Sequence, residues 1–328
     1  MEILSVRNAR RAGLLVSAGL SARKEIIHPL LIDKSDETPL TISRGKNVAE
    51  VERDWGRALS IFGAIHKDTK RDVNERIEAA ILASQMLVNL SRTIQANGIL
   101  KSAFELFPKT EDDVSTILKA RIYEKMAWVA DNQARPRKAL KCLQKSEELF
   151  NSVAQESLPL DAVKSRATNI HFFGRVYFSL GQIAKAMDYF NKDLERLHKH
   201  RLEGNPEPLV EAFNHVWLTR CFTYSNRFGG AHEHAEHALD LFTEAIGEKS
   251  KDTKATESSK GTDTVAHYCL VKAEILLVEG KPAEAVAFAS QALVIRRKRT
   301  PEYSRGENEA SLVLMLAKFQ LGVSRLHY

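Results

Sequence analysis

Small and aromatic residues recur along this chain at fixed distances from a series of turns. If Gly181 is one such turn, the equivalent turns fall at Ser91, Ala134, Asn226, Gly280 and Gly322. Successive turns are 42 to 54 residues apart, and no element shorter than a pair of helices fits that separation. The pattern therefore predicts a series of helix–turn–helix units.

The small residues mark the places where the two helices of a unit cross closely. Five residues after each of the first five turns stands an alanine, namely Ala96, Ala139, Ala186, Ala231 and Ala285. Seven residues before these turns stand Ser84, Ala127, Gly174, Thr219 and Ala273, and twelve residues after three of them stand Ala103, Ala238 and Ala292. We expect all of these positions to be packed between helices, because only small side chains let two helices approach closely.

The clearest unit lies between Phe172 and Phe190. Gly174 and Ala186 are its small crossing positions, Tyr177 and Phe190 fill the seam, and Gly181 ends the first helix. With these residues and spacings the chain resembles the tetratricopeptide repeat family, in a variety with long helices, over residues 77–325. The resemblance implies an all-α, right-handed superhelical solenoid of about five helix pairs with a terminal capping helix.

A second, local resemblance concerns the strings Leu160-Asp-Ala-Val-Lys-Ser-Arg-Ala167, Gly174-Arg-Val and Arg220-Cys-Phe. They are similar to repeats of axonemal outer-dynein-arm docking subunits. Similar strings also occur in repeat proteins that resemble kinesin light chains and in cell-polarity proteins.

The ends and one insert differ from the repeats. We expect residues 1–47 to form an N-terminal arm or linker, residues 48–76 to form partial capping helices, and residues 307–321 to form the last helix. Residues 247–263 carry almost no apolar side chain and predict a mobile loop. The basic segment 1–24 is either a mitochondrial targeting segment or an arm that docks elsewhere.

Composition limits the partners. The 328 residues carry a net charge of +6 and 44 % hydrophobic residues, without any run of about 20 uncharged apolar residues. We therefore expect no membrane span, and the charge is too diffuse to predict nucleic-acid binding. Three widely separated cysteines, Cys142, Cys221 and Cys269, predict buried reduced thiols of an intracellular protein.

Signs of catalysis are lacking in the sequence. It contains no phosphate loop, dinucleotide fingerprint or nucleophile elbow, and we expect no enzyme activity, cofactor or small-molecule substrate. His232-Glu-His-Ala-Glu-His237 misses the zinc-protease spacing, and His234 and His237 fall off the alanine stripe. We interpret them as solvent-facing histidines and expect no metal.

In the repeat class that the chain resembles, the first helices line the concave groove. By helical periodicity the second, fifth, ninth, twelfth and thirteenth residues of a unit should face it, and we call these the groove positions. The candidate binding residues at them are Arg121, Glu124, Trp128, Asn132, His171, Arg175, Phe178, Arg220 and Tyr224. Arginines and aromatic residues are frequent interface anchors, so we expect a partner segment that carries Asp or Glu and a large apolar side chain.

The resemblance implies a non-catalytic scaffold or adaptor that assembles a large intracellular complex. The cytoplasm is the expected location, with the axoneme of a cilium or flagellum as the named setting. A chaperone-tail receptor is disfavoured, because Glu124, Trp128, His171 and Arg175 stand where that clamp has lysine and asparagine. The alternatives are a regulatory sensor that binds a peptide or small ligand, and a mitochondrial repeat protein.

Overall fold

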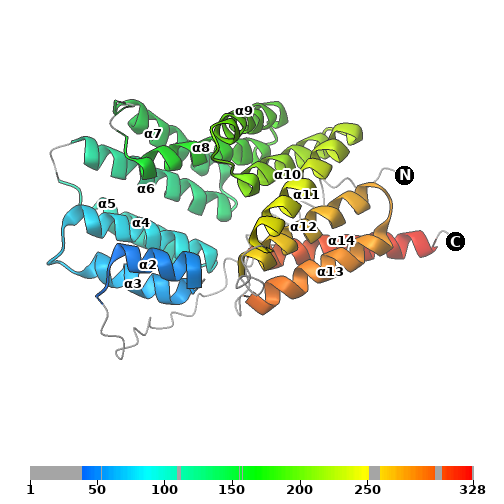
Figure 1. Cartoon of the computed structure of the whole chain (residues 1–328), viewed down its shortest axis with the longest axis horizontal. Helices are drawn as coiled ribbons and strands as arrows, with labels where there is room; N and C mark the ends of the chain where they lie inside the picture. The colour runs from blue at the N-terminus through cyan, green and yellow to red at the C-terminus, as the bar shows by residue number, and fades with distance from the viewer. Residues whose placement is uncertain are drawn as a thin grey trace. The chain divides into compact units, whose positions relative to one another are not determined.

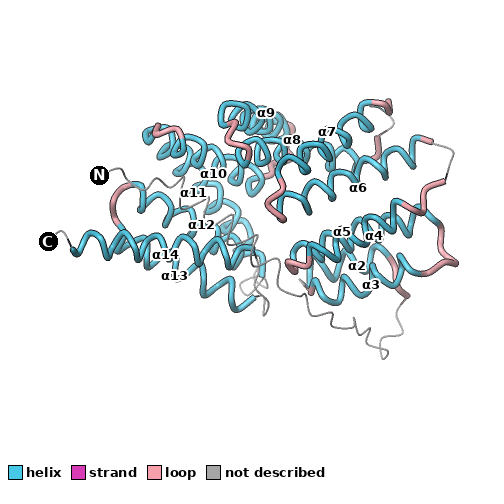
Figure 2. Tube along the Cα trace, turned by 180° about the vertical axis from the view of Figure 1, so that it is seen from behind, coloured by secondary structure: helices cyan, strands magenta, loops and turns pink. Residues whose placement is uncertain are grey.

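The computed structural model describes residues 39–52, 54–108, 112–154, 156, 158–250, 259–299 and 305–326. All regular secondary structure in these residues is helical, which confirms the predicted all-α class. Several pairs of helices that follow one another in the chain lie side by side, as Figures 1 and 2 show for α3 (Trp55–Lys67) with α4 (Val73–Asn89) and for α12 (Ser259–Val278) with α13 (Pro282–Arg299).

The described helices divide into two compact units, and the division at Val176 falls inside α8. The first unit begins with α2 (Ile42–Asn47), the π-helical turn η1 (Val48–Glu52), α3 and α4. It continues with α5 (Thr93–Phe104), α6 (Asp113–Asn132), α7 (Pro136–Asn151) and most of α8 (Leu160–Ser179). The second unit contains α9 (Ile183–Leu202), α10 (Pro208–Tyr224), α11 (Phe228–Ser250), α12, α13 and α14 (Arg305–Leu326).

Local sequence explains several helix starts. Asp112 caps α6 by accepting a hydrogen bond from the Ser115 backbone N–H, while the Ser115 hydroxyl accepts one from the Asp112 N–H. Pro136 and Pro208 stand in the first turns of α7 and α10, where the missing N–H costs no helical hydrogen bond.

The turns between paired helices share one geometry. Positive φ angles of 61°, 56°, 76°, 57° and 73° occur at Ser91, Ala134, Gly181, Asn226 and Gly280. After each turn the next backbone N–H bonds to a carbonyl five residues earlier, as Arg135 does to Ala130 at 2.9 Å and Gln182 to Tyr177 at 3.0 Å. This is the Schellman arrangement, which satisfies carbonyls at a helix end. Five of the six predicted turns therefore lie where the spacing places them.

The sixth predicted turn, at Gly322, is wrong. Gly322 lies inside α14, which runs on to Leu326. A glycine only permits a positive φ, and it does not impose one where helical hydrogen bonds can continue.

The small residues that mark the crossings are all buried. Ala96, Ala139, Ala186, Ala231 and Ala285 are at most 4 % exposed. The same holds for Ala103, Ala238 and Ala292, and Phe190 is fully buried in a cluster that Tyr177 joins. Gly174 is also buried. The crossings thus form the tightly packed parts of the core.

The predicted boundaries shift at the ends of the repeats. Residues 42–47, expected as part of an arm, form α2, which is capped by the Thr41 side chain. Gly45 packs against Phe62 so closely that a Cβ on it would lie 2.4 Å from the ring, so burial against α3 orders this segment. Residues 1–38 of the expected arm lie outside the described residues. Of the predicted loop, α11 and α12 occupy the ends and residues 251–258 lie outside the description.

Candidate functional site

The groove positions of α6 place charged and aromatic groups in the first unit. Arg121 is partly exposed, and no hydrogen bond or ion pair joins its side chain to another described residue. Trp128 packs against Phe172 of α8, with ring centroids 6.2 Å apart, and Lys125 lies 5.7 Å above its ring. Asn132 donates a hydrogen bond to the Trp128 carbonyl at 2.8 Å.

Glu124 does not face solvent, although its groove position predicts that it should. It is 1 % exposed, and it accepts hydrogen bonds from the Ser165 hydroxyl and from the Lys125 ammonium, the latter at 2.8 Å. The carboxylate is therefore used to join α6 to α8.

Arg175 of α8, the ninth residue of its repeat, forms an ion pair with an acidic residue of the preceding first helix. Arg175 pairs with Asp131 of α6 at 2.5 Å, and its guanidinium lies 5.2 Å from the centre of the Phe172 ring. Both partners of the ion pair are largely buried, with side-chain exposures of 13 % and 7 %. His171 contacts the edge of the same Phe172 ring.

The second unit has a similar arrangement one repeat later, but with an acid of the following first helix. Arg220 of α10 pairs with both carboxylate oxygens of Glu274 on α12, at 3.1 and 3.0 Å. Its guanidinium lies 4.8 Å from the centre of the Trp217 ring. Burial opposes the charge, but the carboxylates of Glu274 and Glu309 outweigh it and raise the pKa of Arg220. Both arginines are thus compensated within the protein.

An aromatic cluster surrounds the remaining groove positions of the second unit. Phe178 makes edge contacts with Trp217 and Tyr224 at centroid distances of 5.5 and 5.9 Å, and Trp217 also stacks on Phe190 at 5.9 Å. Phe178 and Tyr224 remain partly exposed. Both rings therefore belong to the aromatic cluster and keep part of their surface exposed.

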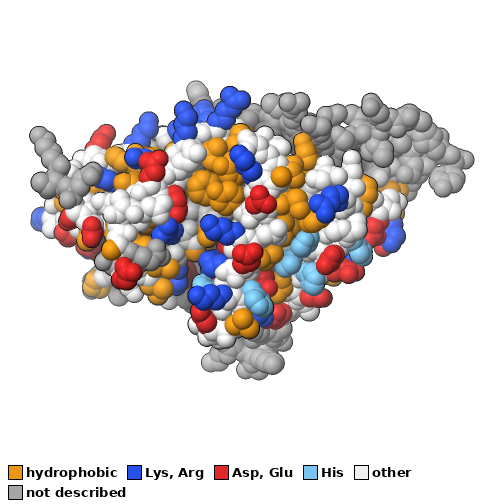
Figure 3. All heavy atoms as spheres, turned by 90° about the horizontal axis from the view of Figure 1, so that it is seen from above, with side chains coloured by type: hydrophobic (Ala, Val, Ile, Leu, Met, Phe, Trp, Pro, Cys, Tyr) orange, Lys and Arg blue, Asp and Glu red, His pale blue; other side chains and the backbone are white. Residues whose placement is uncertain are grey.

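One histidine of α11, His234, is more buried than the sequence suggests. His237 is exposed, but His234 packs on Phe222 and places its Nδ1 3.0 Å from Nδ1 of His215 on α10. Figure 3 shows histidine side chains gathered on one face of the molecule. Burial, with the nearby His234 and His237, lowers the pKa of His215 to about 4.

Within the described residues no three His, Cys, Asp or Glu side chains are placed to hold a metal ion. The three cysteines are free and buried, and burial raises the pKa of the Cys142 and Cys269 thiols. No helix in the described part of the chain is long and apolar enough to cross a bilayer.

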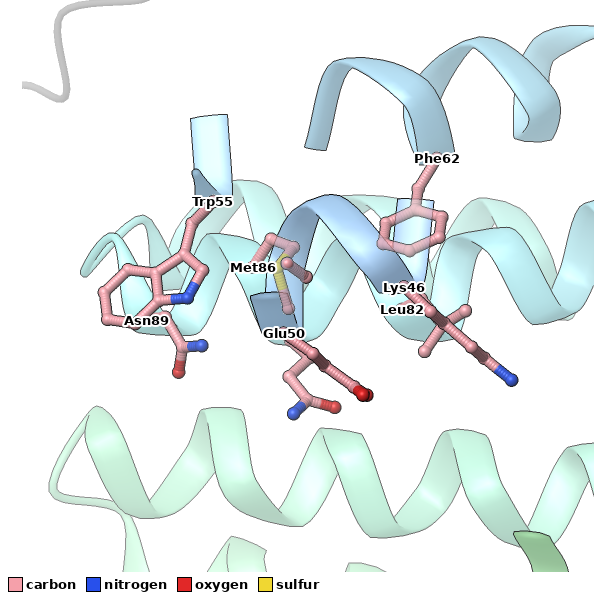
Figure 4. Close-up of a pocket in the computed structure, with 9 residues that line it drawn as sticks. Lys46, Glu50, Trp55, Phe62, Leu82, Met86 and Asn89 are labelled. Atoms are coloured by element: carbon pink, nitrogen blue, oxygen red, sulfur yellow. The ribbon is translucent and has the colours of Figure 1, made fainter. Parts of the chain in front are cut away.

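The structure also reveals a hollow of about 150 Å³ that sequence reasoning missed. It lies between α2 with η1, the start of α3, and α4 (Figure 4). Its lining includes Gln85 and Asn89. They occupy the ninth and thirteenth positions of the helix–turn–helix repeat whose turn is Ser91. The groove register could have indicated these two residues, but the opposite wall depends on how the capping helices pack.

The repeat geometry agrees with comparisons with known proteins. The tetratricopeptide repeat model matches residues 167–195, which are the segment of α8 and α9 around Gly181. The chain therefore contains a tetratricopeptide repeat at these residues. No curated protein sequence matches it significantly.

Solved structures share the tetratricopeptide-like fold at low identity. BtubC (BKLC) from P. vanneervenii is 16 % identical with a TM-score of 0.51, over 75 % of this chain and 92 % of that one. The apo quorum sensor NprR from B. thuringiensis is 15 % identical with a TM-score of 0.51, over 85 % and 70 %. Aspartyl phosphate phosphatase F from Bacillus subtilis is 13 % identical with a TM-score of 0.51, over 96 % and 72 %. At these identities the likeness establishes the helical repeat fold.

Proposed function

We propose that the protein is a non-catalytic adaptor that binds a segment of a partner protein along its first helices and helps to assemble a larger complex. One observation supports this most strongly. Each compact unit has an arginine at the ninth position of a repeat, Arg175 in the first and Arg220 in the second. Each arginine stacks on the aromatic ring three residues earlier and pairs with a carboxylate of a neighbouring first helix. Such ordered guanidinium and aromatic groups suit recognition, because little side-chain entropy remains to be lost on binding.

Arg175 and Arg220 are unsuitable for testing the proposal by substitution, because both form ion pairs within the protein. Charge reversal at Arg175 or Arg220 would set the new carboxylate against Asp131 or Glu274, so lost binding could reflect lost folding. Arg121 is a better choice, because it occupies a groove position and makes no polar contact with another described residue. Arg137, exposed on the second helix α7, offers the same charge change away from the groove positions.

The experiment identifies the partner by affinity capture with mass spectrometry and then measures its Kd for purified variants. We expect Arg121→Glu to weaken binding about tenfold. Arg137→Glu should bind like the parent protein, and both variants should keep the parent circular dichroism and melting temperature. Equal affinity of all three proteins would exclude the groove positions of α6 from the interface.

A second candidate function is a regulatory sensor that binds a peptide or small ligand. The hollow beside α4 favours it, and the fold likeness extends to proteins described as a quorum sensor and as an aspartyl phosphate phosphatase. A rise in melting temperature with an added peptide or metabolite, but no stable protein complex, would favour this candidate. The axonemal setting rests on the sequence strings around Leu160, Gly174 and Arg220 alone.

A further inference from the structure

The hollow beside α4 is surrounded by polar groups that the described part of the protein does not use. The side chains of Glu50, Gln85 and Asn89 make no hydrogen bond or ion pair with another described residue. Figure 4 shows Trp55 and Asn89 at one end of the hollow, Met86 and Glu50 near its middle, and Lys46 at the other end. The π-helical turn η1 carries Glu50, and such turns are frequent at functional sites.

The lining of the hollow carries one cation, Lys46, and one carboxylate, Glu50. Lys46 contributes a cation to the lining, but its ammonium is bonded at 3.3 Å to both Glu78 of α4 and Asp161 of α8. Glu50 is exposed and has no cation bonded to it among the described residues. Glu78 and Asp161 thus neutralise Lys46 while Glu50 keeps its charge in the lining, and a positively charged group would be attracted to the side that carries Glu50.

The walls suit the apolar part of a long cationic side chain. Trp55 contributes an aromatic ring to the lining, and Met86 and Phe62 are buried apolar residues of the same lining. Lysine and arginine bury their methylene stems against such surfaces while their charged ends reach a carboxylate. A cavity of about 150 Å³ holds a group the size of benzene, which is enough for such a stem.

The two carboxamides match the repeat of an extended backbone. Gln85 and Asn89 are one helical turn apart on α4, which corresponds to about 6 Å along the helix axis. Two residues of an extended peptide advance about 6.6 Å, so both carboxamides could bond to backbone groups on the same side of one strand.

We propose that this hollow binds a lysine or arginine side chain of an extended partner segment, with its charge at Glu50, its stem against Trp55 and Met86, and its backbone at Gln85 and Asn89. The proposal rests on the proposed function, since it names the chemistry of one contact with the partner. The basic partner residue proposed here differs from the acidic one predicted for the arginine positions, because the lining carries the carboxylate of Glu50.

The test selects peptides from a random displayed library on the full-length protein and measures their Kd for variants. We expect the selected peptides to share a lysine or arginine, and Glu50→Lys to weaken their binding about tenfold. Selection on Glu50→Lys should favour aspartate or glutamate at that position. Asn89→Ala should weaken all selected peptides, because it removes a backbone contact whatever the partner side chain.

Glu195 serves as the matched control. It is exposed on the second helix α9, and Glu195→Lys makes the same charge change away from the hollow. Glu50 is also exposed, so its replacement should leave the melting temperature unchanged.

Two outcomes would overturn the proposal in distinguishable ways. Peptides that bind, that lose affinity with Arg121→Glu and that are unaffected by Glu50→Lys would reject the hollow and leave the proposed function standing. A library that yields no binding peptide, together with a protein that retains no partner, would reject both.

Discussion

Two asparagines show how single residues distinguish repeats that otherwise look alike. Twelve residues after the turn, where other repeats have Ala103, Ala238 or Ala292, stand Ser146 and Asp193. Each is fully buried and bonded to an asparagine of the next first helix. Asn169 donates to the Ser146 hydroxyl at 3.0 Å, and Asn214 donates to the Asp193 carboxylate at 2.8 Å. Both asparagines stand twelve residues before their own turns, so the two pairs are equivalent.

The Asn214 pair makes a prediction about stability. Asn214→Ile should lower the free energy of unfolding by about 2 kcal/mol, because it removes a hydrogen bond from the buried Asp193 carboxylate. Urea unfolding followed by circular dichroism measures the change.

The double variant Asp193→Ala/Asn214→Ile is the control. It recreates the residues found at the equivalent positions Ala103 and Ile122, which are both fully buried. It should recover part of the loss, since no buried carboxylate remains without its asparagine and Arg196, which also pairs with Asp193, keeps Glu207 as a partner. A double variant no more stable than Asn214→Ile would show that the pair does not act as a unit.

At the scale of elements, the turns share one backbone conformation although their residue types differ. Ala134 and Ser91 are not typical turn residues, yet both adopt the left-handed conformation found at Gly181 and Gly280. The fixed distance from each turn to the buried alanines requires this, because a different turn would rotate the second helix and move its small residue away from the crossing.

The left-handed backbone of Ala134 predicts a stabilising substitution. Its φ is 56°, where a Cβ is strained, so Ala134→Gly should raise the free energy of unfolding by about 1 kcal/mol. The neighbouring Gln133 has a φ of −86°, and Gln133→Gly should bring no gain. Chemical unfolding of the two variants compares them directly, and equal effects would contradict the strain.

At the scale of the whole molecule, buried histidines link stability to pH in both units. In the first unit His66 donates from Nδ1 to the Arg76 carbonyl at 3.1 Å and has Nε2 2.9 Å from the Ser102 hydroxyl. Burial lowers its pKa, as it does for His215 and His234 in the second unit. The charged neighbours of the second pair are His237, which lowers their pKa, and Glu233, which raises that of His234.

The lowered pKa values predict that acid destabilises the protein. Between pH 6.5 and pH 4 an unfolded chain holds a proton on His215 that the folded chain does not, so stability falls as the pH falls through this window. From pH 7 to pH 5 we expect His215 to account for a loss of about 1 to 2 kcal/mol. Urea unfolding at both pH values should show a smaller loss for His215→Gln, and an unchanged loss would assign the dependence to other groups.

Much of the fold could be predicted because it depends on spacing within the chain. The turns at Ser91, Ala134, Asn226 and Gly280 follow from the register of Gly181, and the alanines of the crossings follow from the turns. The same register placed Arg175 and Arg220 correctly on their helices. It could not reveal their partners Asp131 and Glu274, which are 44 and 54 residues away.

The sequence by itself determined the helical pairs, the turns and the small residues at the crossings, because each depends on neighbours at most one helix away. Tertiary structure alone decided that Glu124 is buried, that the arginines are paired and that a hollow opens beside α4. These features depend on which side chains of different repeats meet. The helical period predicts which face of its helix a residue occupies. Burial and charge compensation depend on which side chains of the neighbouring helix pack against that face.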